Sequence, residues 1–544
     1  MFMKKTIGVT ICVLIFWQQL SFCQYQRLAN EGKRGLHVRS IEEVLRLRED
    51  EVDLATAALI VSEHWSDLVY GRRYLSRLDN MAQEIQRRLK KKWLKPNYKA
   101  IPVINNYLFG ELGFKAVPEP NDPNDLFLHS VLDRKQGYCL SLSILYLSLG
   151  ERLGLPLYGV VVPGHFFIRY DDGQTQINIE ATSGAAPPDK HYINKFNIPQ
   201  GNSDSIYMKN LNKIQTLGCF FNNLGNSYSD VGNIESALRA LRTAVQINPA
   251  LSESRANLGN VYLQKGQIED AIYEYLIALQ INPGDAKTYN NLGNAYLRQD
   301  RLNEAISKYF EALQLDPNFI DAHQNLAIAY SRQKRFGQAI NQLKQAIGLE
   351  PKNAGLYNQL GEIYYQTEDY GAAILEYKMA LTIKQNLAEA HYGLAICLGK
   401  LGLVDDEIRA YKEALAIKPD MLAALVNLGN AYFGKQNYDA AIQQYKKAIQ
   451  IKPDDGWILY NLGAAYSNKE DYKKAVDEYL KAVEIDPKIG DAHYGLALGF
   501  YKLQNYESAW KHLNIAQKLG VEISKDLLDA IKKSTEDRGQ KTED

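Results

Sequence analysis

The sequence predicts an α+β domain followed by an all-α superhelical solenoid. In the first part, amphipathic helical patterns precede an apolar helix that begins at Cys139, and short strands with alternating side chains follow that helix. In the second part, from residue 218 onward, the same pattern of small and apolar residues returns every 34 residues. The 544 residues are enough to form both domains, each with its own core.

The balanced charge of the chain argues against a nucleic-acid partner. The 63 Lys and Arg residues are matched by 63 Asp and Glu residues, so the formal net charge is zero and no global field attracts nucleic acid. The histidines lack the spacing of a metal site, and no glycine-rich phosphate or dinucleotide motif precedes a helix. We therefore expect no nucleic-acid partner, no metal site and no cofactor.

Residues 1–23 are typical of a signal peptide. Lys4 and Lys5 precede an apolar run that is short for a membrane span, so we expect an exported protein, periplasmic or extracellular. The segment that ends at Cys23 also resembles a bacterial lipoprotein signal. A lipid anchor at Cys23, and with it a membrane-anchored lipoprotein, therefore stays open as an alternative. Residues 24–39 are predicted to form a flexible lead segment before the first domain.

The helix that begins at Cys139 carries the first candidate catalytic residue. Its dense apolar residues predict burial, and Gly154 and Pro156 end it. In the first turn, a thiol lies at the positive end of the helix dipole, which favours the thiolate, the nucleophilic form. Beyond the signal peptide the only other cysteines are Cys219 and Cys397, and their scatter predicts free thiols rather than a disulfide framework.

The strands after this helix provide two further candidates. Three strands are predicted, at residues 157–162, 165–170 and 175–179. If Asp172 and Gly173 form the two-residue loop of a hairpin, His165 lies directly opposite Glu180 on the neighbouring strand. Cys139, His165 and Glu180 then supply a nucleophile, a base and a carboxylate that orients the base. A polar connector is predicted to follow at residues 187–204.

Several spaced segments of residues 40–204 resemble the transglutaminase-like core of the SirB type. These segments are Asn105–Phe114, Asp133–Cys139, Arg152–Pro156 and Val162–Phe166. Members of that superfamily share a papain-like Cys-His-Asp core and include transglutaminases, peptide amidases and thiol peptidases. The resemblance implies a papain-like α+β domain in which Cys139 is the nucleophile and His165 the base. Glu180 stands where the family has its aspartate.

The resemblance leaves two functions open. In the first, the domain is a thiol enzyme that acts on amide bonds of a peptide or protein by acyl transfer, hydrolysis or cross-linking. In the second, the domain is inert and the chain is an extracytoplasmic scaffold for protein–protein interaction. The second function stays open because some SirB-type relatives lack the cysteine, and because Glu180 is one methylene longer than aspartate.

Nine repeats of 34 residues fill residues 218–523, after a predicted connecting helix at 205–217. Small residues at the eighth, twentieth and twenty-seventh positions let two helices approach closely, and proline ends most repeats. The pattern resembles the tetratricopeptide (TPR) repeat, a helix pair that stacks into a solenoid. Glu407 replaces the seam alanine of repeat six, where we expect local irregularity. Residues 524–534 predict a capping helix, and residues 535–544 a charged tail.

The sixth position of each repeat is the candidate partner-binding surface. It lies about 200° around the first helix from the eighth position, so we expect it to face the concave side of the solenoid. Asparagine occupies it at Asn223, Asn257, Asn291, Asn325, Asn427 and Asn461. A side-chain amide both donates and accepts hydrogen bonds, which suits an extended peptide or protein segment of any sequence. The resemblance to the repeats of O-linked GlcNAc transferase implies the same. The alternative is that these asparagines only solvate the concave wall.

Overall fold

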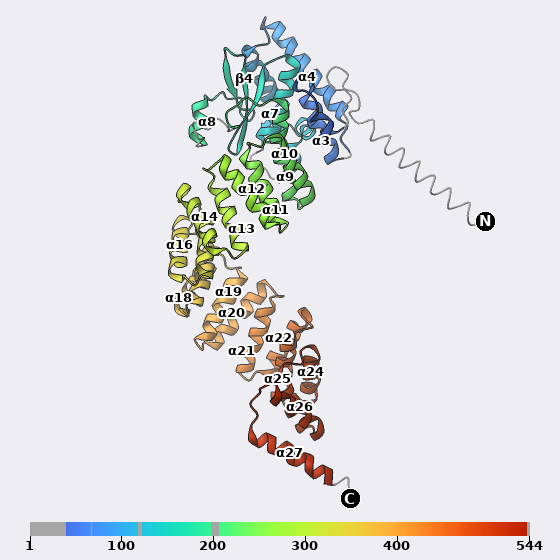
Figure 1. The fold of residues 1–544 in the computed structure, drawn as a ribbon, viewed down its shortest axis with the longest axis vertical. Coiled ribbons are helices and arrows are strands. Elements are labelled where there is room, and N and C mark those ends of the chain that lie inside the picture. Colours follow the sequence, from blue (N-terminus) through green and yellow to red (C-terminus); the bar gives the residue numbers. More distant parts are fainter. Residues whose placement is uncertain (1–39, 67, 118–121, 197, 199–205, 541–544) are drawn as a thin grey trace, which may run out of the picture. The chain divides into compact units, whose positions relative to one another are not determined.

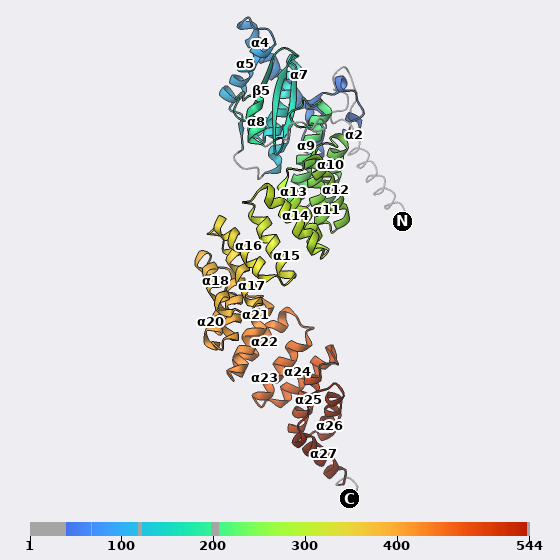
Figure 2. The same cartoon turned by 60° about the vertical axis from the view of Figure 1, so that its left-hand side comes forward.

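The computed structural model of the chain describes residues 40–66, 68–117, 122–196, 198 and 206–540. The predicted signal peptide, the predicted lead and Cys23 lie outside the described residues. The chain divides into two compact units, Met1–Pro317 and Asn318–Asp544. Figures 1 and 2 show the helices and strands of each unit in the order of the chain.

The first unit begins with a group of helices, of which α3, α4 and α6 contact the last one, α7. These are α2 (Ile41–Val44), α3 (Leu54–Trp65), α4 (Gly71–Lys91), α5 (Ile101–Asn105), α6 (Leu128–Arg134) and α7 (Cys139–Leu153). Short helical turns η2 (Glu49–Glu51), η3 (Tyr98–Ala100), η4 (Asn106–Glu111) and η5 (Pro123–Leu126) and a two-stranded parallel sheet, β1 (Lys115–Ala116) with β2 (Gln136–Gly137), connect them. Gly154 caps the end of α7 with φ of +69°, a left-handed conformation that glycine adopts without strain, as its position in the sequence predicts.

A three-stranded antiparallel sheet packs against α7. Its strands are β3 (Leu157–Val162), β4 (His165–Asp171) and β5 (Gln176–Ile179), in the order β3-β4-β5. One face of the sheet joins the core around α7, and the other face packs Phe167 against Tyr192 of α8 (Asp189–Lys195). The sheet therefore lies between α7 and α8, as Figure 1 shows for β4.

The register of β4 with β5 differs from the predicted register. The pairs are Ile168 with Ile179, Arg169 with Asn178, Tyr170 with Ile177 and Asp171 with Gln176. This is two residues away from the predicted pairing, so the prediction that His165 lies directly opposite Glu180 is wrong. Glu180 instead follows the last residue of β5. A shift of two residues leaves every side chain on its predicted face of the sheet.

The turn between these strands explains the different register. Asp172 Oδ1 accepts hydrogen bonds from the backbone N–H groups of Gln174 and Thr175, at 3.0 and 2.7 Å. An aspartate that bonds the backbone in this way begins a turn instead of filling its centre. Gly173 and Gln174 therefore form the loop, and Gly173 has φ of +81°.

Three helix pairs complete the first unit: α9 (Lys213–Asp230) with α10 (Ile234–Ile247), α11 (Ser252–Gln264) with α12 (Ile268–Ile281), and α13 (Ala286–Arg298) with α14 (Leu302–Leu315). The helix predicted at residues 205–217 begins only at Lys213, because Leu211 forms a β-bridge with Gly159 of β3. Phe220 and Leu224 of α9 are buried in the same apolar core as the N-terminal helices. The first repeat thus shares a core with the N-terminal domain.

The second unit is a run of helices. They are α15 (Ile320–Arg332), α16 (Phe336–Leu349), α17 (Ala354–Gln366), α18 (Tyr370–Ile383), α19 (Ala388–Lys400), α20 (Val404–Ile417), α21 (Leu422–Gly434), α22 (Tyr438–Ile451), α23 (Gly456–Asn468), α24 (Tyr472–Ile485), α25 (Gly490–Lys502), α26 (Tyr506–Lys518) and α27 (Lys525–Gln540). Helix α27 runs past the predicted capping helix into the predicted tail. No helix in the described part of the chain has the length and apolarity to span a membrane.

Glycine at the eighth position of a repeat allows close helix packing, as the sequence predicts. A Cβ atom added to Gly429 would lie 2.5 Å from Cε1 of Tyr445 in the same repeat, a distance that packed atoms do not tolerate. In repeat six, α19 and α20 have the same lengths as the helices of the next repeat, so helix length shows no irregularity there. Gly399 faces the Glu407 carboxyl group, which occupies the space a side chain at residue 399 would need.

Candidate active site

The structure brings Cys139 and His165 to one site from neighbouring elements. Cys139 is the first residue of α7 and is half-buried, and His165 is the first residue of β4, which packs against α7. The side chains of Cys139 and Glu180 both interact with the imidazole of His165. The three predicted candidates therefore lie together, although Glu180 reaches the site from the segment that follows β5.

Glu180 holds one nitrogen of the His165 ring. His165 Nε2 lies 3.0 Å from Glu180 Oε1 and 3.1 Å from Oε2. Burial lowers the pKa of His165, but the side chains of Cys139 and Glu180 outweigh this effect and raise it to about 9. Burial alone would raise the pKa of Glu180, yet the hydrogen bonds from His165 and Tyr192 hold it below its usual range. A protonated imidazole beside an ionised carboxylate is therefore the stable form at neutral pH.

Helix α8 supplies two aromatic residues to the site that the sequence did not reveal. Tyr192 donates a hydrogen bond of 2.5 Å from its hydroxyl to Glu180 Oε1 and stacks on Phe167, with the ring centroids 4.0 Å apart. Phe196, directly after α8, stacks on the imidazole of His165 with an interplanar angle of 8°. These contacts fix the orientation of the carboxylate and of the ring.

Arg169 anchors α8 to the sheet. Its side chain is 3% exposed and donates hydrogen bonds to Asp189 Oδ1 at 2.7 Å, Asn178 Oδ1 at 2.9 Å and the backbone oxygen of Met208 at 2.8 Å. Asp189 is the first residue of α8, so the guanidinium holds the helix that carries Tyr192. Arg169 thus supports the site without being part of it.

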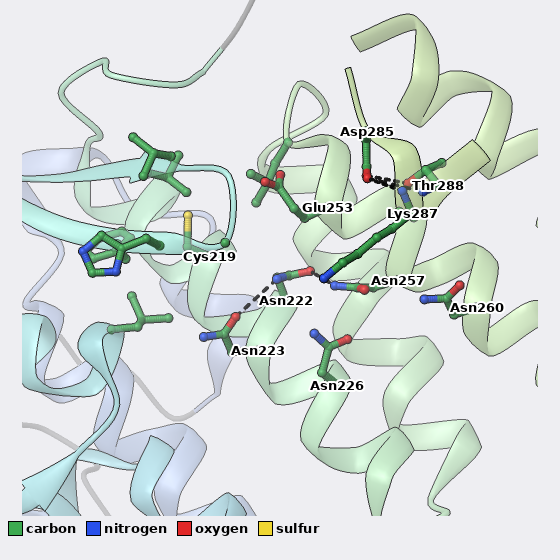
Figure 3. Close-up of a pocket in the computed structure, with 18 of the residues that line it drawn as sticks. Cys219, Asn222, Asn223, Asn226, Glu253, Asn257, Asn260, Asp285, Lys287 and Thr288 are labelled. Atoms are coloured by element: carbon green, nitrogen blue, oxygen red, sulfur yellow. Dashed lines mark hydrogen bonds between the residues drawn. The ribbon is translucent and has the colours of Figure 1, made fainter. Parts of the chain in front are cut away.

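A cavity of about 400 Å³ extends from Cys139 and His165 to the first three repeats. All of its lining residues belong to the first unit. From the repeats, the lining includes residues of α9, α11 and α13, three of which are the predicted partner-binding residues Asn223, Asn257 and Asn291. Figure 3 shows Asn222, Asn223, Asn226, Asn257 and Asn260 gathered along these helices. The thiol, the imidazole and the row of amides share one space.

Hydrogen bonds between repeats orient the amides of this row. Asn257 Nδ2 donates to Asn222 Oδ1 at 3.0 Å, and Asn291 Nδ2 donates to Asn260 Oδ1 at 2.9 Å. Asn260 Oδ1 also accepts a hydrogen bond from Tyr275, at 2.7 Å. Asn222 and Asn260, which we call the second row, therefore orient the amides of Asn257 and Asn291. The sequence signal for it was present, since both residues lie on the same repeat helices as the predicted positions.

The other three predicted partner-binding residues do not line this cavity. Asn325, Asn427 and Asn461 belong to the second unit, where Asn427 Nδ2 donates to the hydroxyl of Tyr392 at 3.3 Å. Cys219 and Cys397 are buried and free, and burial raises the pKa of both thiols. Cys219 lines the same cavity as Cys139. In the described ranges, no three His, Cys, Asp or Glu side chains are grouped so that they could hold a metal ion.

Comparison with family models assigns both parts of the chain. Residues 72–212 match the model of the transglutaminase-like superfamily. Models of the TPR repeat match residues 225–266, 259–300, 332–368, 361–402 and 429–470, and two models of the tetratricopeptide repeat match residues 286–319, 456–489 and 308–341. The chain therefore consists of a transglutaminase-like domain followed by multiple TPR repeats. Because repeats of this class bind peptides or proteins, the array is a protein-interaction module.

Similar proteins share parts of this arrangement. A UPF0162 protein from Xylella fastidiosa strain Temecula1 is 27% identical over 199 residues, which cover 36% of this chain and 70% of that protein. A UPF0162 protein from strain 9a5c is 32% identical over 123 residues, 22% of this chain and 43% of that protein. Among solved structures, that of MamA is 28% identical, covers 30% of this chain and 95% of its own, and has a TM-score of 0.28.

Proposed function

We propose that the protein is an exported thiol enzyme that transfers acyl groups from amide bonds of a polypeptide bound by its first repeats. Cys139 Sγ attacks the amide carbonyl carbon, and the carbon–nitrogen bond breaks as His165 gives its proton to the leaving nitrogen. The product is a thioester on Cys139. Water or an amine then attacks the thioester, loses a proton to His165 and releases Cys139, so the net reaction is hydrolysis or cross-linking.

The hydrogen bond between His165 Nε2 and Glu180 is the observation that carries this proposal. With Nε2 held by the carboxylate, Nδ1 is the nitrogen that remains for the thiol of Cys139. The raised pKa of His165, about 9, keeps the imidazole protonated at neutral pH. The imidazolium is then both the counterion of the Cys139 thiolate and the acid that protonates the leaving amine. The N-terminus of α7 supplies a backbone N–H at Cys139 for the developing oxyanion.

The amides that line the cavity support a polypeptide as the substrate. Asn257 and Asn291 each donate one hydrogen bond to the second row, which leaves their oxygens to accept from a peptide N–H. Because an amide pairs with the backbone, recognition of this kind suits an extended segment of varied sequence. The residues typical of a signal peptide at positions 1–23 support export.

The test is to incubate the enzyme with an unfolded polypeptide and to look for release of ammonia, shortened chains and cross-linked chains. Acid quenching followed by mass spectrometry should detect the polypeptide-derived thioester on Cys139. A Cys139→Ala variant should form no product and no thioester while it still binds the polypeptide. Binding without a product in the wild-type protein would instead favour the interaction scaffold.

A further inference from the structure

Glu253 is a half-buried residue of the cavity, and the proposed reaction does not use its carboxylate. It follows Ser252 at the start of α11 and lines the cavity together with Cys139 and His165. Its Oε2 accepts a hydrogen bond of 2.6 Å from the hydroxyl of Tyr207, but its Oε1 is inaccessible to water and has no partner among the described residues. An ionised carboxylate in this position is costly unless a cation lies beside it.

Asp285 adds a second carboxylate to the same wall of the cavity. It caps the N-terminus of α13, where its Oδ1 accepts hydrogen bonds from the backbone N–H groups of Lys287 and Thr288 and its Oδ2 accepts one from the Thr288 hydroxyl. The charge of Asp285 contributes to the raised pKa of Glu253, after the larger effect of burial. The two carboxylates therefore act on the same space, and Figure 3 shows both beside the cavity.

Lys287 does not neutralise these carboxylates. It also lines the cavity, but in the described part of the chain no ion pair joins its ammonium group to Glu253 or Asp285. Figure 3 shows its side chain extended toward Asn222 and Asn257. Of the charged side chains that the repeats contribute to the lining, two are acidic and one is basic. The repeat side of the cavity therefore carries one more acidic than basic side chain.

We propose that Glu253 and Asp285 form a cation subsite, which binds an ammonium or guanidinium group of the polypeptide whose amide bond reaches Cys139. The subsite selects substrates with a lysine, an arginine or a free amino terminus near the reacting amide. A guanidinium or ammonium group that lies beside the two carboxylates compensates for the burial of Glu253 Oε1. The inference deepens the proposed function, on which it rests for the identity of the reacting thiol.

Charged thiol reagents test the subsite without requiring turnover. Three methanethiosulfonates of equal length, with a trimethylammonium, a hydroxyl or a sulfonate end, should modify Cys139 at different rates, read by peptide mass spectrometry to separate it from Cys219. The quantity compared is the rate of Cys139 modification by the trimethylammonium reagent divided by the rate for the sulfonate reagent. We expect Glu253→Gln and Asp285→Asn each to lower this ratio at least threefold. Both changes remove charge at nearly constant shape, and asparagine still caps α13.

Glu235→Gln is the matched control, because Glu235 lies on α10, is exposed, pairs with Lys265 and does not line the cavity. It should leave the ratio unchanged. Equal ratios in the wild type and in both cavity variants would overturn the subsite. A Cys139 that no reagent modifies would overturn both the subsite and the proposed function. If one of the two cavity variants fails to fold, the rate ratio of the other variant still tests the subsite.

Peptide binding separates the subsite from the reaction. In the full-length Cys139→Ala variant, fluorescence anisotropy should show tighter binding of a lysine-containing peptide than of its glutamate counterpart, and Glu253→Gln should weaken the former at least threefold. This selection, together with a wild-type protein that forms no thioester on Cys139, would support the subsite and reject the proposed reaction. Equal binding of both peptides, with thioester formation intact, would reject the subsite alone.

Discussion

His165 is the residue whose charge state decides whether the proposed site works. Its pKa of about 9 lies above the value of an ordinary histidine, because Cys139 and Glu180 stabilise the protonated ring against the effect of burial. The protonated ring stabilises the folded protein fully below the pKa of an unfolded histidine, and this contribution is lost as the pH rises through about 9.

We therefore expect the rate of acylation of Cys139 to fall as the pH rises through about 9, since the imidazolium then loses the proton that the leaving group needs. Initial rates measured between pH 6 and about 10.5 check this expectation. The descending limb should disappear in His165→Ala, together with most of the rate. A limb that persists in that variant would assign it to another group.

Glu180→Gln should slow acylation about a hundredfold or more, while the melting temperature changes little. The amide keeps the shape of the carboxylate and can still accept from Tyr192, but it no longer stabilises the imidazolium. Kinetics and thermal unfolding of the same preparation separate the two effects. Loss of folding with an unchanged rate per folded molecule would make Glu180 a structural residue instead.

At the scale of single elements, local patterns in the sequence predicted α7 well because burial and capping act within the helix. Cys139 opens the helix and Gly154 ends it, as the apolar run and the glycine indicate. The register of β4 with β5 was missed because it depends on one side chain, Asp172, whose hydrogen bonds to the following backbone move the turn. Register is a tertiary property that alternation alone does not determine.

The contribution of α8 to the site was missed for a similar reason. Residues 187–204 are polar and contain proline, which predicts a connector, but Arg169 of β4 binds Asp189 and holds a short helix there. Tyr192 and Phe196 are four residues apart and therefore project from the same side of that turn. This spacing was the one available signal, and its meaning depends on a contact that no local pattern contains.

Glu407→Ala should stabilise the second unit by about 0.5–2 kcal/mol, because alanine is the residue that the other repeats place in the helix seam. Burial raises the pKa of Glu407, so its ionised form is disfavoured in the folded protein. Chemical unfolding of the wild type and the variant at neutral pH measures the difference. Lower stability in the variant would mean that the carboxyl group fills the space beside Gly399 better than a methyl group does.

At the scale of the whole molecule, the first helix of the repeat array is attached to the N-terminal domain of the same unit. Lys213 of α9 donates hydrogen bonds of 2.7 Å to Val52 O and 2.6 Å to Glu151 Oε1, and Tyr228 of α9 lies 5.0 Å from Trp65 between ring centroids. These contacts place the first helices of the array beside the domain that carries Cys139. The proposed binding surface and the proposed nucleophile therefore lie in one cavity.

Asn257→Ala combined with Asn291→Ala should weaken binding of an unfolded polypeptide several-fold, since both amides line this cavity. The matched control is Asn427→Ala with Asn461→Ala, the same positions in the second unit, which should have a smaller effect. Isothermal titration with the Cys139→Ala variant gives the affinities, and circular dichroism checks that helicity is intact. Equal affinity in both double variants and the parent would leave these asparagines with a solvating role only.

Selective labelling of Cys139 by a thiol-directed acyl electrophile tests the central claim most directly. The account predicts that the reagent acylates Cys139 in preference to the buried Cys219 and Cys397, and that His165→Ala abolishes this selectivity while the protein stays folded. Peptide mass spectrometry after a short exposure gives the result. Labelling of Cys139 that is no faster than that of the buried cysteines, or that is unchanged in His165→Ala, would contradict an assembled thiol–imidazole site.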